Sequence, residues 1–160
     1  LWLNANYWAF DRVYHHTAPV SMIYALRESL KLVLQEGLEK RYQRHHQNAV
    51  ALWAGLEALN LELVAEEKYR LDQITPVWIP EGIDDDEVRK ILLREYNIEI
   101  GKGLGQFAGR VWRIGLMGES SKAQYVMAVL SALEEILSRL GYEVPYGAGV
   151  AAASRSLSSN

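Results

Sequence analysis

The segment Val111-Trp112-Arg113-Ile114-Gly115-Leu116-Met117 predicts a β-strand, because it is rich in β-branched and aromatic residues. Period-two alternation places Val111, Arg113, Gly115 and Met117 on one face of that strand. An arginine on so apolar a strand must find an anion, since burying an unpaired guanidinium is costly. Its planar fork matches a carboxylate through two parallel hydrogen bonds. The anion is either an Asp or Glu of a neighbouring element or a bound carboxylate, and the residues alone leave both open.

A glycine-rich stretch, residues 101–109, separates this strand from another expected at Ile98-Glu99-Ile100. It superficially resembles a dinucleotide-binding fingerprint, but the element that follows is a strand instead of the required helix. A Walker-type phosphate loop is excluded, because Lys102 is followed by Gly103 and not by Ser or Thr. The stretch is therefore either a loop that covers a ligand or a plain turn between two strands.

A long helical pattern precedes these strands. Apolar residues recur at helical spacing from Met22 to Leu59, which predicts one long helix or two helices broken near Gly37. This apolar stripe is longer than a small sheet can cover. We therefore expect the helix after Thr17 to pack against a second chain or a larger domain.

Two shorter helices and two β-prone runs complete the pattern. Asp84-Asp85-Asp86-Glu87 begins a capped helix, and Ser121-Lys122-Ala123-Gln124 fits a capping box before another. Residues 61–64 and 75–79 are short and β-prone, with polar residues or proline around them. The predicted fold is α+β, with a long helix followed by a small, mainly antiparallel sheet covered by helices.

Composition excludes several classes of protein. The 160 residues include 17 basic and 20 acidic side chains, which give a net charge of -3. This charge does not indicate the basic surface that binds nucleic acid or an anionic membrane. The absence of cysteine excludes disulfide scaffolds, thiolate zinc sites and a cysteine nucleophile. No apolar run approaches the roughly 20 residues that span a bilayer. We expect a soluble protein with no nucleic-acid or membrane partner.

Two hydroxyl groups precede the long helix. Thr17 is a candidate N-cap for a helix that begins near residue 18, and Tyr14 lies three residues earlier. The unsatisfied N–H groups and the dipole of a helix N-terminus attract anions, so this segment has the chemistry of a phosphate site. An ordinary N-cap beside a packed tyrosine explains the same residues.

The four histidines do not predict a metal site. His15 and His16 are adjacent, as are His45 and His46, so neither pair has the i, i+4 spacing of a helical metal site. Solvated positions or positions at the edge of the core are expected for them.

Several motifs, in order from about residue 7 to residue 140, resemble one enzyme family, the alanine–glyoxylate and serine–pyruvate aminotransferases. The motifs are Tyr14-His15-His16-Thr17-Ala18-Pro19-Val20, Ala25-Leu26-Arg27-Glu28-Ser29-Leu30, Glu36-Gly37-Leu38-Glu39, Tyr96-Asn97-Ile98-Glu99-Ile100 and Val111-Trp112-Arg113-Ile114-Gly115-Leu116-Met117-Gly118. The family loop commonly has two successive glycines before Leu-Gly, whereas this chain has Lys102 before Gly103.

The resemblance implies a homodimeric, fold-type-I enzyme of the α/β superfamily that uses pyridoxal 5'-phosphate. It implies that Tyr14 and Thr17 bind the cofactor phosphate of the neighbouring subunit and that Arg113 holds the substrate α-carboxylate. The implied reaction moves an amino group from alanine or serine to glyoxylate or a related 2-oxo acid by a ping-pong mechanism. The lysine that binds the cofactor belongs to a large N-terminal domain upstream of residue 1, so this segment alone is expected to be inactive.

The resemblance also divides the chain. Residues 1–60 are expected to be the end of the large domain with an interdomain or dimer-interface helix, residues 61–141 the small C-terminal domain, and residues 142–160 a tail with a poorly ordered end. Because Ser158-Ser159-Asn160 is not a peroxisomal address, we expect a cytoplasmic protein.

A second hypothesis is a non-catalytic α+β domain that binds an amino acid or a partner subunit. The tryptophan and tyrosine residues near the start support it, because such side chains are common at interfaces. The sequence upstream of Leu1 discriminates between the hypotheses. A lysine in a large α/β domain favours the enzyme, and an initiator codon at residue 1 favours the binding domain.

Overall fold

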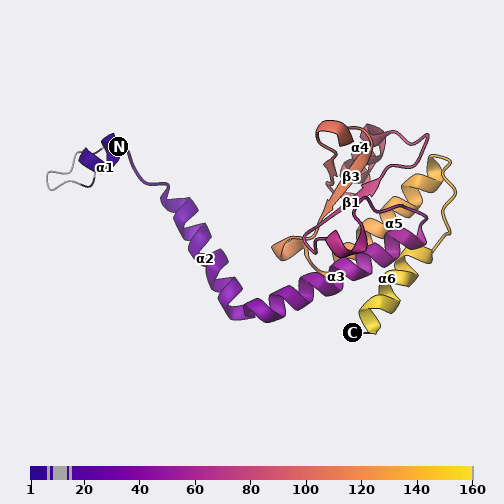
Figure 1. Cartoon of the computed structure of the whole chain (residues 1–160), viewed down its shortest axis with the longest axis horizontal. Coiled ribbons are helices and arrows are strands. Elements are labelled where there is room, and N and C mark those ends of the chain that lie inside the picture. The colour runs from indigo at the N-terminus through magenta and orange to yellow at the C-terminus, as the bar shows by residue number, and fades with distance from the viewer. Residues whose placement is uncertain (7, 9–13, 15, 160) are drawn as a thin grey trace. The chain divides into compact units, whose positions relative to one another are not determined.

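The computed structural model describes residues 1–6, 8, 14 and 16–159, and the chain forms two units (Figure 1). The first unit, Leu1–Leu38, contains the helices α1 (Trp2–Asn6) and α2 (Val20–Glu36). The second unit, Glu39–Asn160, contains the sheet and the remaining helices.

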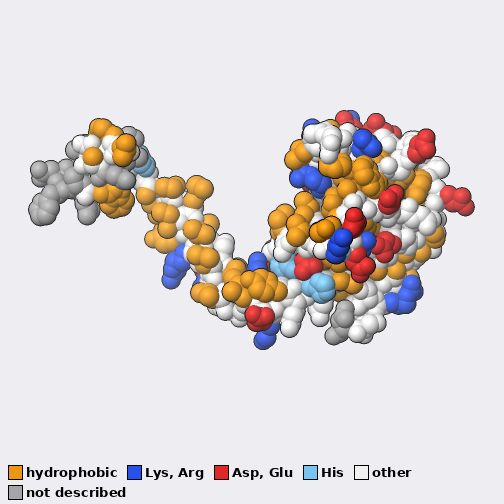
Figure 2. Space-filling model, viewed as in Figure 1, with side chains coloured by type: hydrophobic (Ala, Val, Ile, Leu, Met, Phe, Trp, Pro, Cys, Tyr) orange, Lys and Arg blue, Asp and Glu red, His pale blue; other side chains and the backbone are white. Residues whose placement is uncertain are grey.

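Gly37 separates α2 from α3 (Leu38–Ala58). Its φ of 83° and ψ of 141° are non-helical and favour glycine, so two helices form instead of one. No residue of α2 is buried, and Figure 2 shows apolar side chains along the length of this helix. Met22 is 71% exposed and Leu26 is 59% exposed. The packing of α2 against a second chain or a larger domain stays a prediction.

The sheet of the second unit has three antiparallel strands in the order β1-β3-β2. They are β1 (Ile74–Trp78), β2 (Gly101–Lys102) and β3 (Val111–Gly115). The central strand, β3, pairs with β1 from Ile74↔Gly115 to Trp78↔Val111 and with β2 through Gly101↔Arg113 and Lys102↔Trp112. The predicted α+β fold with a small antiparallel sheet is confirmed.

Helices α4 (Asp85–Tyr96), α5 (Ala123–Arg139) and α6 (Ala148–Ser158) complete the second unit, with 3-10 turns at Glu67–Tyr69, Gly105–Phe107 and Gly118–Ser120. In Figure 1, α3 and α5 lie beside the sheet, and α5 contacts both α4 and α6. Among the helices of the described residues, none has both the length and the apolar composition needed to cross a membrane.

The hydrophobic core lies between the helices and the sheet face that carries Val77 and Trp112, both fully buried. The Trp112 ring also donates a hydrogen bond from Nε1 to the Asp85 carboxylate at 3.1 Å, which attaches the start of α4 to β3. The helices contribute Leu52 and Leu56 of α3, Val88 and Leu92 of α4, Leu133 and Leu137 of α5, and Ala153 of α6.

Two expected strands differ in the structure. Residues 61–64 make only an isolated bridge, Leu63↔Val77, instead of a strand. The strand expected at 98–100 is displaced to Gly101–Lys102. The residues that follow Tyr96 form the C-terminal end of α4 instead. Asn97 is left-handed with φ 55°, and the Ile98 N–H donates to the Leu92 carbonyl at 3.0 Å.

Two of the expected helix caps lie in the second unit, and one of them is correct. Asp84 caps α4, and its carboxylate accepts the Glu87 N–H at 2.7 Å. The capping box expected at 121–124 is wrong, because Lys122 is the N-cap of α5 and makes no capping hydrogen bond from its side chain. Ser121 is instead fully buried, where its Oγ accepts a hydrogen bond from the Asn48 amide at 3.3 Å.

The expected poor order at the end of the chain is also wrong for Ala148–Ser158, which forms α6. Small residues let this helix approach α3 closely. A Cβ at Gly149 would lie 2.9 Å from Leu59 Cγ, and a Cβ at Gly55 would lie 3.0 Å from the Gly149 carbonyl oxygen. The small residues that suggested a mobile tail therefore allow close packing.

Replacing Gly149 with leucine is expected to lower the free energy of unfolding by about 1 to 3 kcal/mol, because the added side chain overlaps Leu59. The loss is expected even though leucine has the higher helix propensity. Urea unfolding of the Gly149→Leu variant measures it. The exposed Ser154→Ala change in the same helix is the control, and equal stabilities of the two variants would contradict the close packing of α6.

Candidate active site

Arg113 lies on β3, on the sheet face opposite the core. Its neighbours Trp112 and Ile114 are buried, whereas Arg113 is only partly buried and Gly115 is exposed. The predicted alternation therefore holds for Arg113 and Gly115, whereas Val111, expected on the same face, is buried. Met117 lies beyond the end of the strand and is 58% exposed.

The Arg113 guanidinium has one polar partner within the described residues, the Lys102 carbonyl, which accepts a hydrogen bond from Nε at 2.9 Å. No carboxylate of this part of the chain pairs with it. An arginine has five N–H donors, so the Nη1 and Nη2 donors remain available for an anion. Of the two alternatives raised by the sequence, the internal ion pair is therefore not formed within the described residues.

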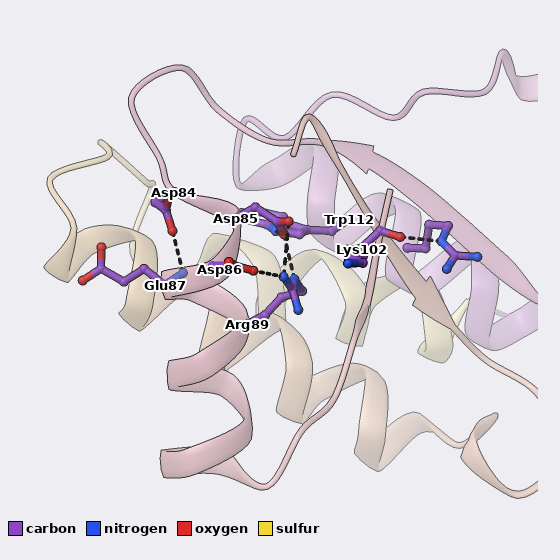
Figure 3. Close-up of polar contacts among 8 residues, drawn as sticks. Asp84, Asp85, Asp86, Glu87, Arg89, Lys102 and Trp112 are labelled. Atoms are coloured by element: carbon purple, nitrogen blue, oxygen red, sulfur yellow. Dashed lines mark hydrogen bonds and ion pairs between the residues drawn. The ribbon is translucent and has the colours of Figure 1, made fainter. Parts of the chain in front are cut away.

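The acidic residues at the start of α4 have partners of their own (Figure 3). Arg89 Nε donates to the Asp85 carboxylate at 2.8 Å, and Arg89 also pairs with Asp86. The hydrogen bond with Asp85 is the main cause that raises the pKa of Arg89 above its ordinary value. Asp85 is therefore paired with Arg89 and also accepts from Trp112, so its charge is matched without Arg113.

A polar cluster from α3 holds the segment that follows β3. The Gly118 N–H donates to His45 Nε2 at 3.1 Å, so this nitrogen carries no proton and His45 Nδ1 donates to the Arg41 carbonyl at 2.7 Å. Arg44 Nη1 donates to the carbonyls of Gly118 at 3.0 Å and Ser121 at 2.6 Å. The segment after β3 is therefore attached to α3 through both the N–H and the carbonyl of Gly118.

The histidines adopt the positions expected for them where the structure describes them. His45 is 7% exposed at the edge of the core, and His46 is exposed, with Nδ1 3.1 Å from an Asp72 oxygen. His15 lies outside the described residues. The structure shows no group of three potential metal ligands among the residues that it describes.

Tyr14 and Thr17 lie together in the first unit. The Tyr14 hydroxyl is 2.6 Å from Thr17 Oγ1, and both residues are exposed. The expected N-cap role of Thr17 is wrong, because α2 begins at Val20 with Pro19 as its N-cap and without a capping hydrogen bond from a side chain. Both hydroxyls thus precede the helix, and Thr17 is not used to cap it.

Sequence reasoning missed two partners of Arg113, the Lys102 carbonyl and Gly101. Gly101 lies directly opposite Arg113 in the β2–β3 pair. The available signal was a glycine inside a short strand, which often marks a close approach of other groups. The pairing register that brings it to Arg113 is a property of the folded chain.

No family model matches the chain. Comparison with individual proteins is more informative. Over 148 residues the chain is 43% identical to the (S)-ureidoglycine–glyoxylate transaminase of Bacillus subtilis (strain 168). This match covers 92% of the chain and 36% of that protein. Over 142 residues it is 40% identical to the alanine–glyoxylate aminotransferase of Felis catus. This match covers 86% of the chain and 34% of that protein.

A solved structure agrees in three dimensions. The crystal structure of the ureidoglycine–glyoxylate aminotransferase from Bacillus subtilis superposes with a TM-score of 0.89 and 41% identity, over 97% of this chain and 40% of that one. The chain belongs to the alanine–glyoxylate aminotransferase family. The family predicted from the motifs is thus confirmed.

The chain spans about a third of the length of the aminotransferases that it matches, 36% and 34% for the two relatives above. It matches the C-terminal part of these enzymes, and its sheet and helices match their C-terminal domains. The predicted domain boundary at residue 60 stays a prediction, and the compact second unit begins at Glu39.

Proposed function

We propose that the chain is the substrate-binding C-terminal part of a pyridoxal 5'-phosphate-dependent aminotransferase. The reaction moves an amino group from alanine or serine to glyoxylate or a related 2-oxo acid. The observation that carries the proposal is the guanidinium of Arg113, held on a strand by the Lys102 carbonyl without a carboxylate partner in the described part of the chain. Both substrates of such a reaction carry the carboxylate that this group fits.

The role of Arg113 is orientation of the substrate. With Nε bonded to Lys102, the four N–H groups of Nη1 and Nη2 remain, and one from each nitrogen can form an end-on, two-pronged grip on a carboxylate. Such a grip restricts rotation of the amino acid and places its α-carbon. Orientation of this kind can lower a barrier by several kcal/mol.

The hydroxyls of Tyr14 and Thr17 fit the phosphate of the cofactor. They are exposed and share a hydrogen bond at 2.6 Å, so the two hydroxyls lie side by side just before the N-terminus of α2. Hydroxyl donors and a helix N-terminus together favour a phosphate group. When bound, the cofactor supplies the electron sink that amino-group transfer requires.

Other parts of the enzyme are proposed from the family. None of the chain's lysines lies in a cofactor-binding motif, so we place that lysine in a large domain N-terminal to this segment. We propose a homodimer with the phosphate site facing the neighbouring subunit, in the cytoplasm. The apolar side chains of α2, none of them buried, are available for such packing.

Amino-group transfer by the full-length protein tests the proposal. With pyridoxal 5'-phosphate, alanine and glyoxylate, the expected products are pyruvate and glycine, and serine is the second donor to test. A full-length protein that binds these substrates but transfers no amino group would support the non-catalytic binding domain instead.

Replacing Arg113 with lysine keeps the charge but removes the planar fork. We expect KM for the amino donor to rise by about tenfold, while the cofactor content of the purified protein stays unchanged. Steady-state kinetics and cofactor absorbance measure the two quantities. An unchanged KM would show that two-pronged recognition at Arg113 is absent.

A further inference from the structure

Gly101 is the residue that faces Arg113 across the sheet. The two residues form a pair between β2 and β3. A Cβ at position 101 would lie 3.3 Å from Arg113 Nη2 and 3.5 Å from both Cζ and Nε. The guanidinium therefore lies against Gly101, in tight contact with the position that a Cβ would take.

This position does not require glycine for backbone reasons. Gly101 is not among the glycines with positive φ, so alanine is compatible with its conformation. Gly103 is a contrast in the same segment, because a Cβ there would lie 2.0 Å from the Phe107 carbonyl oxygen. The three atoms nearest to a Cβ at Gly101 all belong to the movable end of the Arg113 side chain.

The hydrogen bond to Lys102 depends on this space. Arg113 donates from Nε to the Lys102 carbonyl at 2.9 Å while its guanidinium lies against Gly101, and the N–H groups of Nη1 and Nη2 remain for another acceptor. A side chain at position 101 would displace the guanidinium by a few tenths of an ångström at least. Such a shift is easily absorbed by the fold, but it disturbs the geometry of a two-pronged contact.

We propose that Gly101 is a positioning residue that, with the Lys102 carbonyl, sets the direction from which Arg113 receives a substrate carboxylate. This inference rests on the proposed function of Arg113. It assigns a role to the glycine itself: the missing side chain lets the guanidinium lie flat on β2. A residue with any side chain at this position is expected to weaken recognition of the carboxylate.

The test uses Gly101→Ala and Gly101→Val in the full-length, cofactor-loaded protein. For Gly101→Ala we expect KM for alanine to rise about threefold to tenfold with a smaller change in kcat, and Gly101→Val is expected to have the larger effect. Calorimetric titration with propionate, which is alanine without its amino group, is expected to show a matching rise in Kd. The unfolding temperature is expected to be unchanged or slightly higher, since alanine restricts the unfolded chain.

Gly115→Ala is the matched control, because a Cβ at Gly115 would lie 3.3 Å only from the tip of the Met117 side chain. It adds the same methyl group to the same sheet and is expected to leave propionate binding unchanged. If Gly115→Ala weakens binding as much as Gly101→Ala does, the effect is a general one on the sheet and the inference is wrong.

The deciding comparison repeats Gly101→Ala in an Arg113→Ala background. If Gly101 acts through Arg113, the effect of Gly101→Ala on propionate affinity disappears in that background. An effect of the same size with and without Arg113 overturns the inference. If Arg113→Ala weakens binding but Gly101→Ala does not, only the role of Gly101 is lost. If Arg113→Ala itself has no effect, the proposed function is lost as well.

Discussion

Replacing Arg113 with alanine is expected to lower kcat/KM for the amino donor by about 10² to 10³, which corresponds to roughly 3 to 4 kcal/mol. The variant loses the carboxylate contact and with it the orientation of the substrate. Because no carboxylate in the described part of the chain pairs with Arg113, the change strands no buried charge there. The unfolding temperature is therefore expected to change little.

A purely structural arginine predicts the reverse result. If Arg113 served an ion pair, its removal would leave an unpaired carboxylate and lower the unfolding temperature before it affected kinetics. Arg110→Ala is a suitable control, since Arg110 precedes β3 and lies 5.3 Å from the centre of the Trp78 ring. It removes an arginine from the same segment and is expected to leave kcat/KM unchanged. A sharp loss of stability with a normal KM in Arg113→Ala would refute the site assignment.

The double change Tyr14→Phe and Thr17→Ala is expected to weaken cofactor binding. Each hydrogen bond to a charged phosphate contributes about 1.5 to 3 kcal/mol, so the dissociation constant is expected to rise by about two orders of magnitude or more. The two hydroxyls contact each other at 2.6 Å, so the effects of the single variants are not expected to be additive. Dialysis of the loaded full-length protein, followed by cofactor absorbance, measures the loss.

Tyr69→Phe is the control for this measurement, because Tyr69 is exposed and belongs to the other unit. Its cofactor affinity is expected to match the wild type. Equal retention by the double variant and by Tyr69→Phe would reject the phosphate-binding role of Tyr14 and Thr17.

Features that depend on local chemistry were predictable from the sequence. The cap at Asp84, the break at Gly37 and the strand around Arg113 each follow from the preferences of neighbouring residues. The family was also predictable, because its motifs occur in order along most of the chain. Strand alternation predicts that Arg113 and Gly115 share a face, and the structure shows that this face lies opposite the core.

Features that depend on distant residues were not predictable. Ser121 has the local pattern of a helix cap, but Asn48 of α3 engages it instead. The end of the chain was expected to be poorly ordered, yet Gly149 of α6 packs against Leu59. Gly101 reads as part of a flexible loop, and only the register with β3 shows that it faces Arg113. In each case a tertiary contact overrides the local signal.

Selectivity between alanine and ethylamine tests the central claim most directly, because ethylamine is alanine without its carboxylate. The ratio of the two kcat/KM values is measured for the full-length wild type and for Arg113→Ala, and any loss of folded protein cancels in that ratio. We predict that the wild type strongly prefers alanine and that Arg113→Ala reduces the preference by about 10² to 10³. A variant that keeps the wild-type preference would contradict the claim that Arg113 holds the substrate carboxylate.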